Sequence, residues 1–209
     1  RHVRISKTAG VGRDANPKGI DRGGWTLTGG VTFYHSPVDI SRCKISDALS
    51  EDALNIIASD FTLRDSVFSN VSSDAFDGDF VNGSITNCTF ERIGGDAIDL
   101  SGSNVTIKNV RVFGTADKAI SAGEGSQVTL SDCRFEDVGF GIASKDLSKV
   151  RGDNLHIVKA RVAALAAYQK KNIFGPSTIT VNHLKVSKTS NDYLIQKGSS
   201  ATINGENVE

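Results

Sequence analysis

The sequence predicts an all-β protein, a parallel β-helix (solenoid) built from rungs of about 22 residues. Three observations predict this fold class. A phrase returns every 22 residues, and apolar residues alternate within each unit, which is typical of strands. The chain of 209 residues also contains 21 glycines and only three prolines. Such a composition favours many short strands joined by tight turns.

The repeated phrase opens each unit with a small residue. That residue recurs at intervals of 22, at Ala53, Ala75, Ala97, Ala119 and Gly141. The phrase returns one residue late at Ala164-Leu165, and again at Tyr193-Leu194 after an insertion over residues 170–177. Regular recurrence over this length is the mark of a repeat architecture.

A second phrase, with apolar residues at i, i+3 and i+5, follows about half a unit later in seven copies. Its middle position holds Cys43, Cys88 and Cys133 in alternate units. The seven copies predict seven to eight rungs, which stack at about 4.8 Å. Neighbouring cysteines would then lie about 9.6 Å apart, beyond the roughly 7 Å that a disulfide spans. We expect three reduced, buried thiols.

Other repeat folds fit less well. Leucine-rich repeats need leucines at fixed offsets that are absent here, and helical repeats need longer units with 3.6-residue periodicity. Residues 161–171 have high helix propensity. Their register still matches the repeat, which favours a strand.

The repeat divides the chain into two parts. Residues 31–209 are expected to form the β-helix, and residues 1–30, which fit the repeat poorly, an irregular N-terminal cap or partial rung. The chain starts with Arg and has no Met, so we expect it to be part of a longer parent chain.

Charge and hydropathy exclude two classes of partner. Lysine and arginine number 24, as do aspartate and glutamate, which argues against a nucleic-acid surface driven by bulk electrostatics. The sequence has no run of 18 apolar residues, so membrane insertion is not expected.

The phrase Gly94-Gly95-Asp96-Ala97-Ile98-Asp99, with Ser101-Gly102-Ser103 after it, is similar to rungs of carbohydrate-active members of the pectin-lyase-like superfamily. The resemblance covers residues from about 25 to 209. It implies a right-handed parallel β-helix, a polysaccharide partner and an extracellular or cell-surface location. The Gly-His-Gly and Arg-Ile-Lys motifs of polygalacturonases are missing, so the resemblance does not imply that activity.

Stacking of rungs predicts an acidic ladder. Asp77 and Asp99 should point outward one rung apart, with carboxylates about 5 Å from each other. Such a pair titrates together and suits acid–base glycoside chemistry at the retaining separation. We predict Asp77 and Asp99 as the catalytic pair. Together with Asp79 on the same strand face, they are alternatively candidate ligands for Ca²⁺.

Further side chains flank this ladder. Lys118 and Lys145 are placed to neutralise an acidic sugar, and we predict a substrate-binding set of Asp74, Asp96, Lys118, Lys145 and Tyr168. No histidine stands in register with the acids, which argues against a histidine-dependent nucleophile or a zinc cluster.

Structural explanations compete with these roles. Outward aspartates on a solenoid are often a solvated face that limits aggregation, and this applies to Asp77 and Asp99. Asp52, Asp74 and Asp96 precede a strand, where an Asx-turn hydrogen bond accounts for aspartate.

Two functions follow. The leading hypothesis is an extracellular domain that engages a polysaccharide, as a hydrolase, lyase or epimerase if it is an enzyme. The alternative is a non-catalytic β-helical spacer or adhesion module of a larger surface protein. The long loop over residues 170–177 is expected several rungs from Asp77, which counts for the alternative because an enzyme needs a groove walled by loops.

Overall fold

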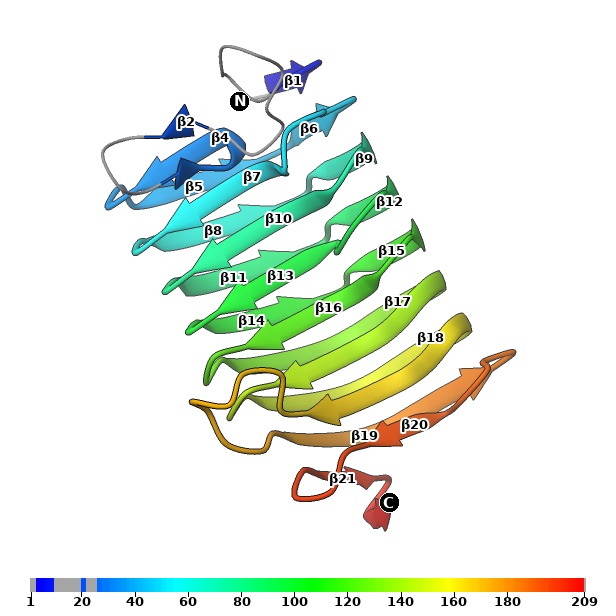
Figure 1. Cartoon of the computed structure of the whole chain (residues 1–209). Coiled ribbons are helices and arrows are strands. Elements are labelled where there is room, and N and C mark those ends of the chain that lie inside the picture. The colour runs from blue at the N-terminus through cyan, green and yellow to red at the C-terminus, as the bar shows by residue number, and fades with distance from the viewer. Residues whose placement is uncertain (1–2, 10–19, 22–25, 209) are drawn as a thin grey trace.

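The computed structural model describes residues 3–9, 20–21 and 26–208. These residues form a parallel β-solenoid of about eight turns, as the repeat predicts (Figure 1). The N-terminal and C-terminal ends of the chain lie at opposite ends of the stack. In this part of the chain, no helix has the length and apolar character needed to cross a membrane.

Three parallel sheets run along the stack. The first sheet contains β4 (Gly29–Tyr34), β7 (Asp52–Ile57), β10 (Asp74–Asp79), β13 (Ile98–Ser101), β16 (Lys118–Gly123) and β20 (Tyr193–Ile195). The second contains β5 (Val38–Ser41), β8 (Asp60–Arg64), β11 (Asn82–Thr86), β14 (Asn104–Lys108) and β21 (Ser200–Ile203). The third contains β1 (Val3–Ser6), β6 (Cys43–Ser46), β9 (Val67–Val71), β12 (Thr89–Ile93) and β15 (Arg111–Thr115). Three longer strands bend through two or more sheets: β17 (Gln127–Lys145), β18 (Lys149–Tyr168) and β19 (Thr178–Ser187).

The core is made of columns of like residues that stack from rung to rung. The alanines of the repeated phrase are fully buried, as are Leu54, Phe76 and Ile98, which pair in register. In the third sheet the rings of Phe68 and Phe90 stack with centroids 4.9 Å apart. Each rung therefore buries its apolar side chains against equivalent residues of its neighbours, inside one continuous core that the three sheets enclose.

The corner between the second and third sheets has its own ladder. Its residues have positive φ, near 50°, which asparagine and aspartate tolerate better than most side chains: Asp65, Asn87, Asn109, Asp132, Asn154 and His183. Their side chains bond along the stack, with the Asn87 amide donating to Asp65 and the Asn109 amide donating to Asn87. The polar side chains at these corners thus form hydrogen bonds with one another along the stack.

The strand interpretation of residues 161–171 is confirmed as far as Tyr168, where β18 ends. Leu165 pairs with Ile142 of the preceding rung and is fully buried. Stacking against neighbouring rungs outweighs the helix propensity of this segment.

At the N-terminal end, β1 adds to the third sheet by pairing in parallel with β6. A separate antiparallel pair joins β2 (Ile20–Asp21) and β3 (Thr26–Leu27). Much of the predicted cap, including residues 10–19 and 22–25, lies outside the described residues, so its boundary stays a prediction. At the other end, β22 (Glu206–Val208) pairs antiparallel to β21.

The cysteine column is confirmed: all three thiols are free. Cys88 and Cys133 are buried, and burial raises the pKa of each thiol to about 11. The expectation of burial is wrong for Cys43, which is only partly buried because it lies near the end of the stack.

We therefore expect a thiol reagent to label Cys88 and Cys133 only after denaturation, because the thiolate is the reactive form and both are shielded. Counting reactive thiols before and after unfolding checks this. Slow labelling of one thiol in the native protein is expected at Cys43. Fast native labelling of two or more would contradict the burial described here.

Candidate acid–base site on the first sheet

The candidate site lies on the outer face of the first sheet, at β7, β10 and β13. Asp77 pairs in register with Asp99 of the next rung, as predicted. On its other side Asp77 pairs with Asn55. The sequence repeat therefore placed the two predicted catalytic carboxylates correctly as neighbours on one face.

Asn55 organises the acids of this face, a role that the sequence analysis missed. Its side-chain amide donates to Asp77 Oδ2 at 3.1 Å and to Asp79 Oδ2 at 3.3 Å. Asn55 is almost fully buried, and its Oδ1 has no hydrogen-bond partner among the described residues. The sequence signal that could have revealed this role is the position of Asn55, which is equivalent to Asp77 and Asp99 in the next two rungs.

A second acidic column, Asp52, Asp74 and Asp96, begins the same rungs. The Asx-turn expectation is wrong for two of these residues, because their carboxylates bond to the next rung. Asp74 Oδ1 accepts the N–H of Asp96 at 2.7 Å, and Asp96 Oδ1 accepts the N–H of Lys118 at 2.8 Å. Gly95 leaves room for this contact, since a Cβ there would lie 2.0 Å from Asp74 Oδ1.

Burial changes the protonation of these acids. It raises the pKa of Asp52 and of Asp74 to about 7, and that of Asp96 to about 6. The pKa of Asp77 is raised well above its usual range, first by burial and then by Asp52, Asp79 and Asp99. Burial also raises the pKa of Asp79, against the effect of the Asn55 hydrogen bond. Asp77 therefore keeps its proton to a higher pH than an exposed aspartate does.

The two predicted lysines both reach the acids. Lys118 Nζ lies 3.4 Å from Asp96 Oδ1 and also pairs with Asp117. Burial disfavours the charge on Lys118, but Asp96 and Asp117 outweigh it and raise the pKa of the ammonium group. Lys145, which is 8% exposed, lies with Nζ 3.8 Å from Asp99 Oδ1. Asp99 is therefore ion-paired, whereas burial and the neighbouring acids disfavour the charged form of Asp77.

The fit of Ca²⁺ can be judged from the donor set. One carboxylate oxygen each from Asp74, Asp96 and Asp99 lies within 4.8 Å of the others. Of the predicted ligands, only Asp99 belongs to this group, since Asp77 and Asp79 share the Asn55 amide instead. Ammonium groups already pair with Asp96 and Asp99. The lysines supply the positive charge that Ca²⁺ would bring, so the residues present fit a resident ion poorly.

The long loop extends one side chain back toward the acids. Buried Asp146 accepts the backbone N–H groups of Lys170 and Lys171 with one oxygen, at 2.6 and 2.7 Å. The Lys171 side chain pairs with Glu124, directly after β16, and its charge lowers the pKa of Asp79. The base of the loop lies several rungs from Asp77, as expected, but its Lys171 side chain reaches back to the rung of Glu124, two rungs from Asp79.

An aromatic hollow continues the face toward the C-terminal end. It has a volume of about 430 Å³ and is lined mainly by apolar atoms, including those of Phe140, Tyr168, Leu194 and Ile195. Tyr168 pairs in register with Lys145, and Lys145 is ion-paired with Asp99, so the hollow is linked to the acids through Lys145. The Lys118 ammonium lies 5.9 Å from the centre of the Phe140 ring. All predicted site residues thus share one face.

Lys118→Ala is expected to raise the pKa of Asp96 further, because the Lys118 charge is the largest effect that opposes burial there. A carboxylate NMR titration of the labelled protein measures this. The exposed Lys149 of β18 provides the control, Lys149→Ala, which should leave the Asp96 titration unchanged. An unchanged titration in Lys118→Ala as well would remove Lys118 from the site.

Comparison with protein families gives one match. A family model described as a right handed beta helix region matches residues 29–184. Comparison with curated proteins gives no significant match.

Proposed function

Since the chain belongs to the right handed beta helix family, we propose that it is an enzyme that cleaves or modifies an extended polysaccharide at the acidic face of the first sheet. We further propose that it works outside the cell or at its surface, where such polymers occur. The supporting evidence is local to the site, because the fold alone hosts many functions.

One observation carries the proposal: Asp77, whose pKa is raised by burial and by neighbouring acids, stands in register beside Asp99, which is ion-paired with Lys145. Neighbouring carboxyl groups in contrasting environments divide the roles of acid and base. Asp77 would donate a proton to the leaving oxygen of a glycosidic bond. Asp99 would act as the carboxylate that takes a proton or attacks the sugar.

The rest of the face fits a polymer that lies along the stack. Lys118 and Lys145 would bind acidic groups of the substrate, and Asp74 and Asp96 would accept hydrogen bonds from hydroxyls. The hollow beside Tyr168 would hold one sugar ring against an aromatic side chain. The loop that carries Lys171 would border the chain on one side.

The test is product analysis. The protein is incubated with a panel of neutral and acidic polysaccharides, and the new ends are identified by mass spectrometry and by NMR of the anomeric protons. Asp99→Asn should abolish any activity found, whereas Asp60→Asn, an exposed acid on the second sheet, should not. Activity that survives Asp99→Asn would overturn the assignment of this pair.

A second candidate, a non-catalytic spacer or adhesion module, is favoured by one observation. Between the third and first sheets the turns beside the acids are short, as between β12 and β13, where only residues 94–97 intervene. No long loop therefore walls that side of the face in β10 and β13. If acidic-face substitutions raise stability and no glycan is bound or altered, this function holds instead.

A further inference from the structure

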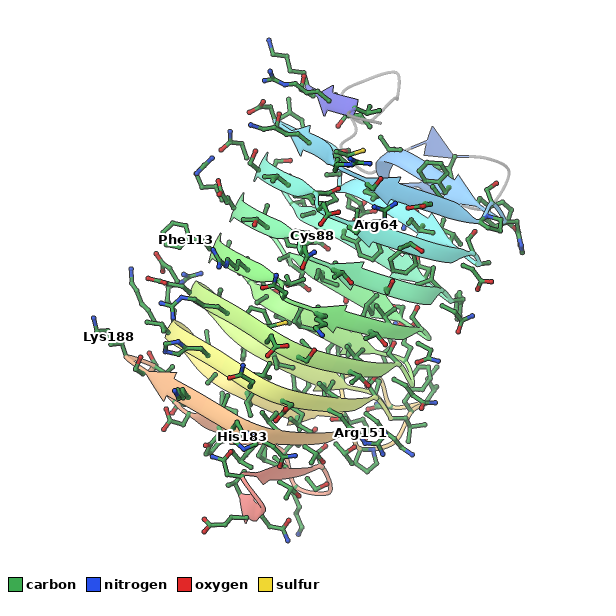
Figure 2. The ribbon with its side chains drawn as sticks, turned by 180° about the vertical axis from the view of Figure 1, so that it is seen from behind. Arg64, Cys88, Phe113, Arg151, His183 and Lys188 are labelled. Atoms are coloured by element: carbon green, nitrogen blue, oxygen red, sulfur yellow. The ribbon has the colours of Figure 1, made fainter. Side chains whose placement is uncertain are left out.

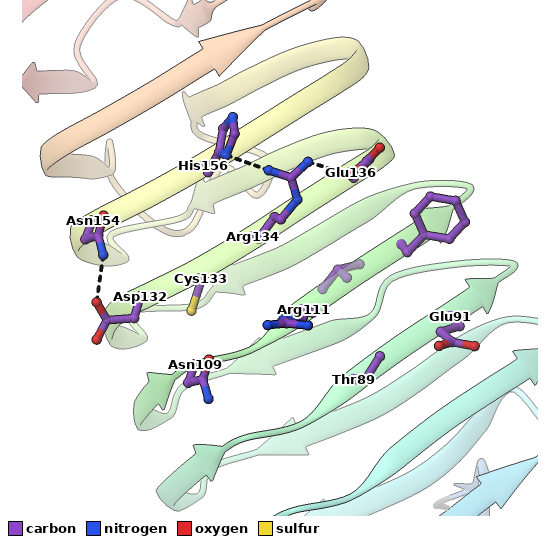
Figure 3. A pocket seen from close by; sticks show the side chains of 12 residues that line it. Thr89, Glu91, Asn109, Arg111, Asp132, Cys133, Arg134, Glu136, Asn154 and His156 are labelled. Atoms are coloured by element: carbon purple, nitrogen blue, oxygen red, sulfur yellow. Dashed lines mark hydrogen bonds and ion pairs between the residues drawn. The ribbon is translucent and has the colours of Figure 1, made fainter.

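A polar groove lies on the outer face of the third sheet, away from the acid–base site. Its volume is about 580 Å³, and its lining comes from β12, β15, β17 and β18 (Figure 3). The residues that matter here are Arg111 and Phe113 of β15, with Glu91, Arg134, Glu136 and His156 around them. None of these side chains has a part in the proposed reaction on the first sheet.

Most charges in this groove are already compensated. Arg134 donates to Glu136 at 2.7 Å and contacts His156 Nδ1 at 2.5 Å. Glu91 is paired with Arg92 at 3.4 Å. Because arginine only donates, Nδ1 of His156 must accept, so the proton of the neutral ring is on Nε2. The Arg134 cluster is thus a fixed set of donors and acceptors.

Arg111 is the exception. Across the described parts of the chain, its guanidinium has neither an ion pair nor a hydrogen bond, and Figure 3 shows it near the middle of the groove without a dashed line. The lining therefore offers one uncommitted positive charge with a planar pair of donors. Such a fork matches a carboxylate in geometry.

An exposed aromatic ring stands beside this cation. Phe113 is 50% exposed and lies at the edge of the molecule (Figure 2). It is two residues after Arg111 on the same strand, so both side chains point to one face about 6 to 7 Å apart. This spacing suits one ring whose apolar face packs on the aromatic side chain while its carboxylate reaches the guanidinium.

The acidic side chains of the groove narrow the ligand class. Glu91, Glu136 and Asp132 would repel a densely charged polyanion, such as nucleic acid or an acidic peptide. Hydroxyl groups, in contrast, can donate to these carboxylates and accept from arginine, histidine and asparagine. We propose that this groove binds a sugar residue that carries a carboxylate, with Arg111 on the carboxylate and Phe113 against the ring.

Titration calorimetry of the full chain with trimers of galacturonic and mannuronic acid tests the proposal. Arg111→Ala is expected to lower the affinity about 10- to 100-fold, because a hydrogen-bonded ion pair is lost. The matched control is Arg151→Ala, which removes another exposed arginine, on β18, and should bind as the wild type does. Methyl esters of the same trimers should bind the wild type as weakly as Arg111→Ala binds the acids.

Chemical-shift mapping separates this groove from the acid–base site. Perturbed signals in β15 that vanish in Arg111→Ala support the proposal, even where no polysaccharide is cleaved. Binding of neither trimer, perturbation confined to the first sheet, or equal affinity of the Arg111→Ala variant would overturn it. Equally tight, Arg111-dependent binding of a polyglutamate peptide would overturn the assignment to sugars.

Discussion

Replacing Asp77 by asparagine is expected to lower the rate of polysaccharide turnover about 100- to 10,000-fold, the usual contribution of a general acid or base. Asparagine keeps the shape of the side chain and accepts the hydrogen bond from Asn55 through its oxygen, but it has no acidic proton to donate. Burial and the neighbouring acids raise the pKa of Asp77 in the wild type and so favour its protonated form. The loss should therefore appear in kcat far more than in KM.

The measurement is steady-state kinetics on whichever polysaccharide the product analysis identifies, with the melting temperature recorded in parallel. Asp79→Asn is the matched control, because Asp79 bonds to the same Asn55 amide but lies two residues along the strand. A modest change is expected there. An Asp77→Asn enzyme with near wild-type kcat would exclude Asp77 as the acid.

Stability is expected to fall as the pH rises from about 4 to about 7. The folded protein holds protons on Asp52 and Asp74, with pKa values of about 7, that the unfolded chain releases near 3.8. In this pH window the folded state binds more protons, so a rise in pH favours unfolding. Moving one pKa from 3.8 to about 7 corresponds to about 4 kcal/mol, which is the upper limit for each residue.

Asp74→Asn should remove much of this dependence. Its side-chain oxygen still accepts the N–H of Asp96, while the buried charge that forms above pH 7 is gone. The variant should be about 2 to 4 kcal/mol more stable than the wild type at pH 8, and equal to it near pH 4. Chemical denaturation at several pH values measures the free energy of unfolding. The control Asp60→Asn, which replaces an exposed acid, should show the same pH dependence of the free energy of unfolding as the wild type. If Asp74→Asn also shows the wild-type pH dependence, Asp74 does not cause it.

The sequence repeat predicted the features that depend on the register between neighbouring rungs. The pairing of Asp77 with Asp99 and the column of three cysteines both follow from a constant rung length, because parallel stacking places equivalent residues side by side. Strand formation over the alanine-rich end of β18 could be predicted for the same reason. Such features need no knowledge of side-chain conformation.

Features that depend on side-chain direction or loop path could not be predicted in this way. Asp74 bonds to the backbone of the next rung rather than to its own turn, and a turn motif in the sequence does not distinguish the two. The contact of Lys171 with Glu124 depends on the way in which Asp146 holds the loop. The uncommitted charge of Arg111 likewise depends on side-chain direction, because Arg134 pairs with Glu136, and Glu91 pairs with Arg92.

The fully buried alanine column also has a consequence for how the chain can change in length. Ala53, Ala75, Ala97 and Ala119 meet nearly identical surroundings, so the boundary between any two central rungs resembles the next. Gain or loss of a whole rung would preserve every column and shift the ends by about 4.8 Å. In this chain the extra residues lie between strands or at a change of register, as in the loop between β18 and β19 and at the shift between Val138 and Phe140. Insertion of whole rungs would therefore increase the distance between binding groups on the surface in multiples of the rung spacing, while the buried columns stay the same.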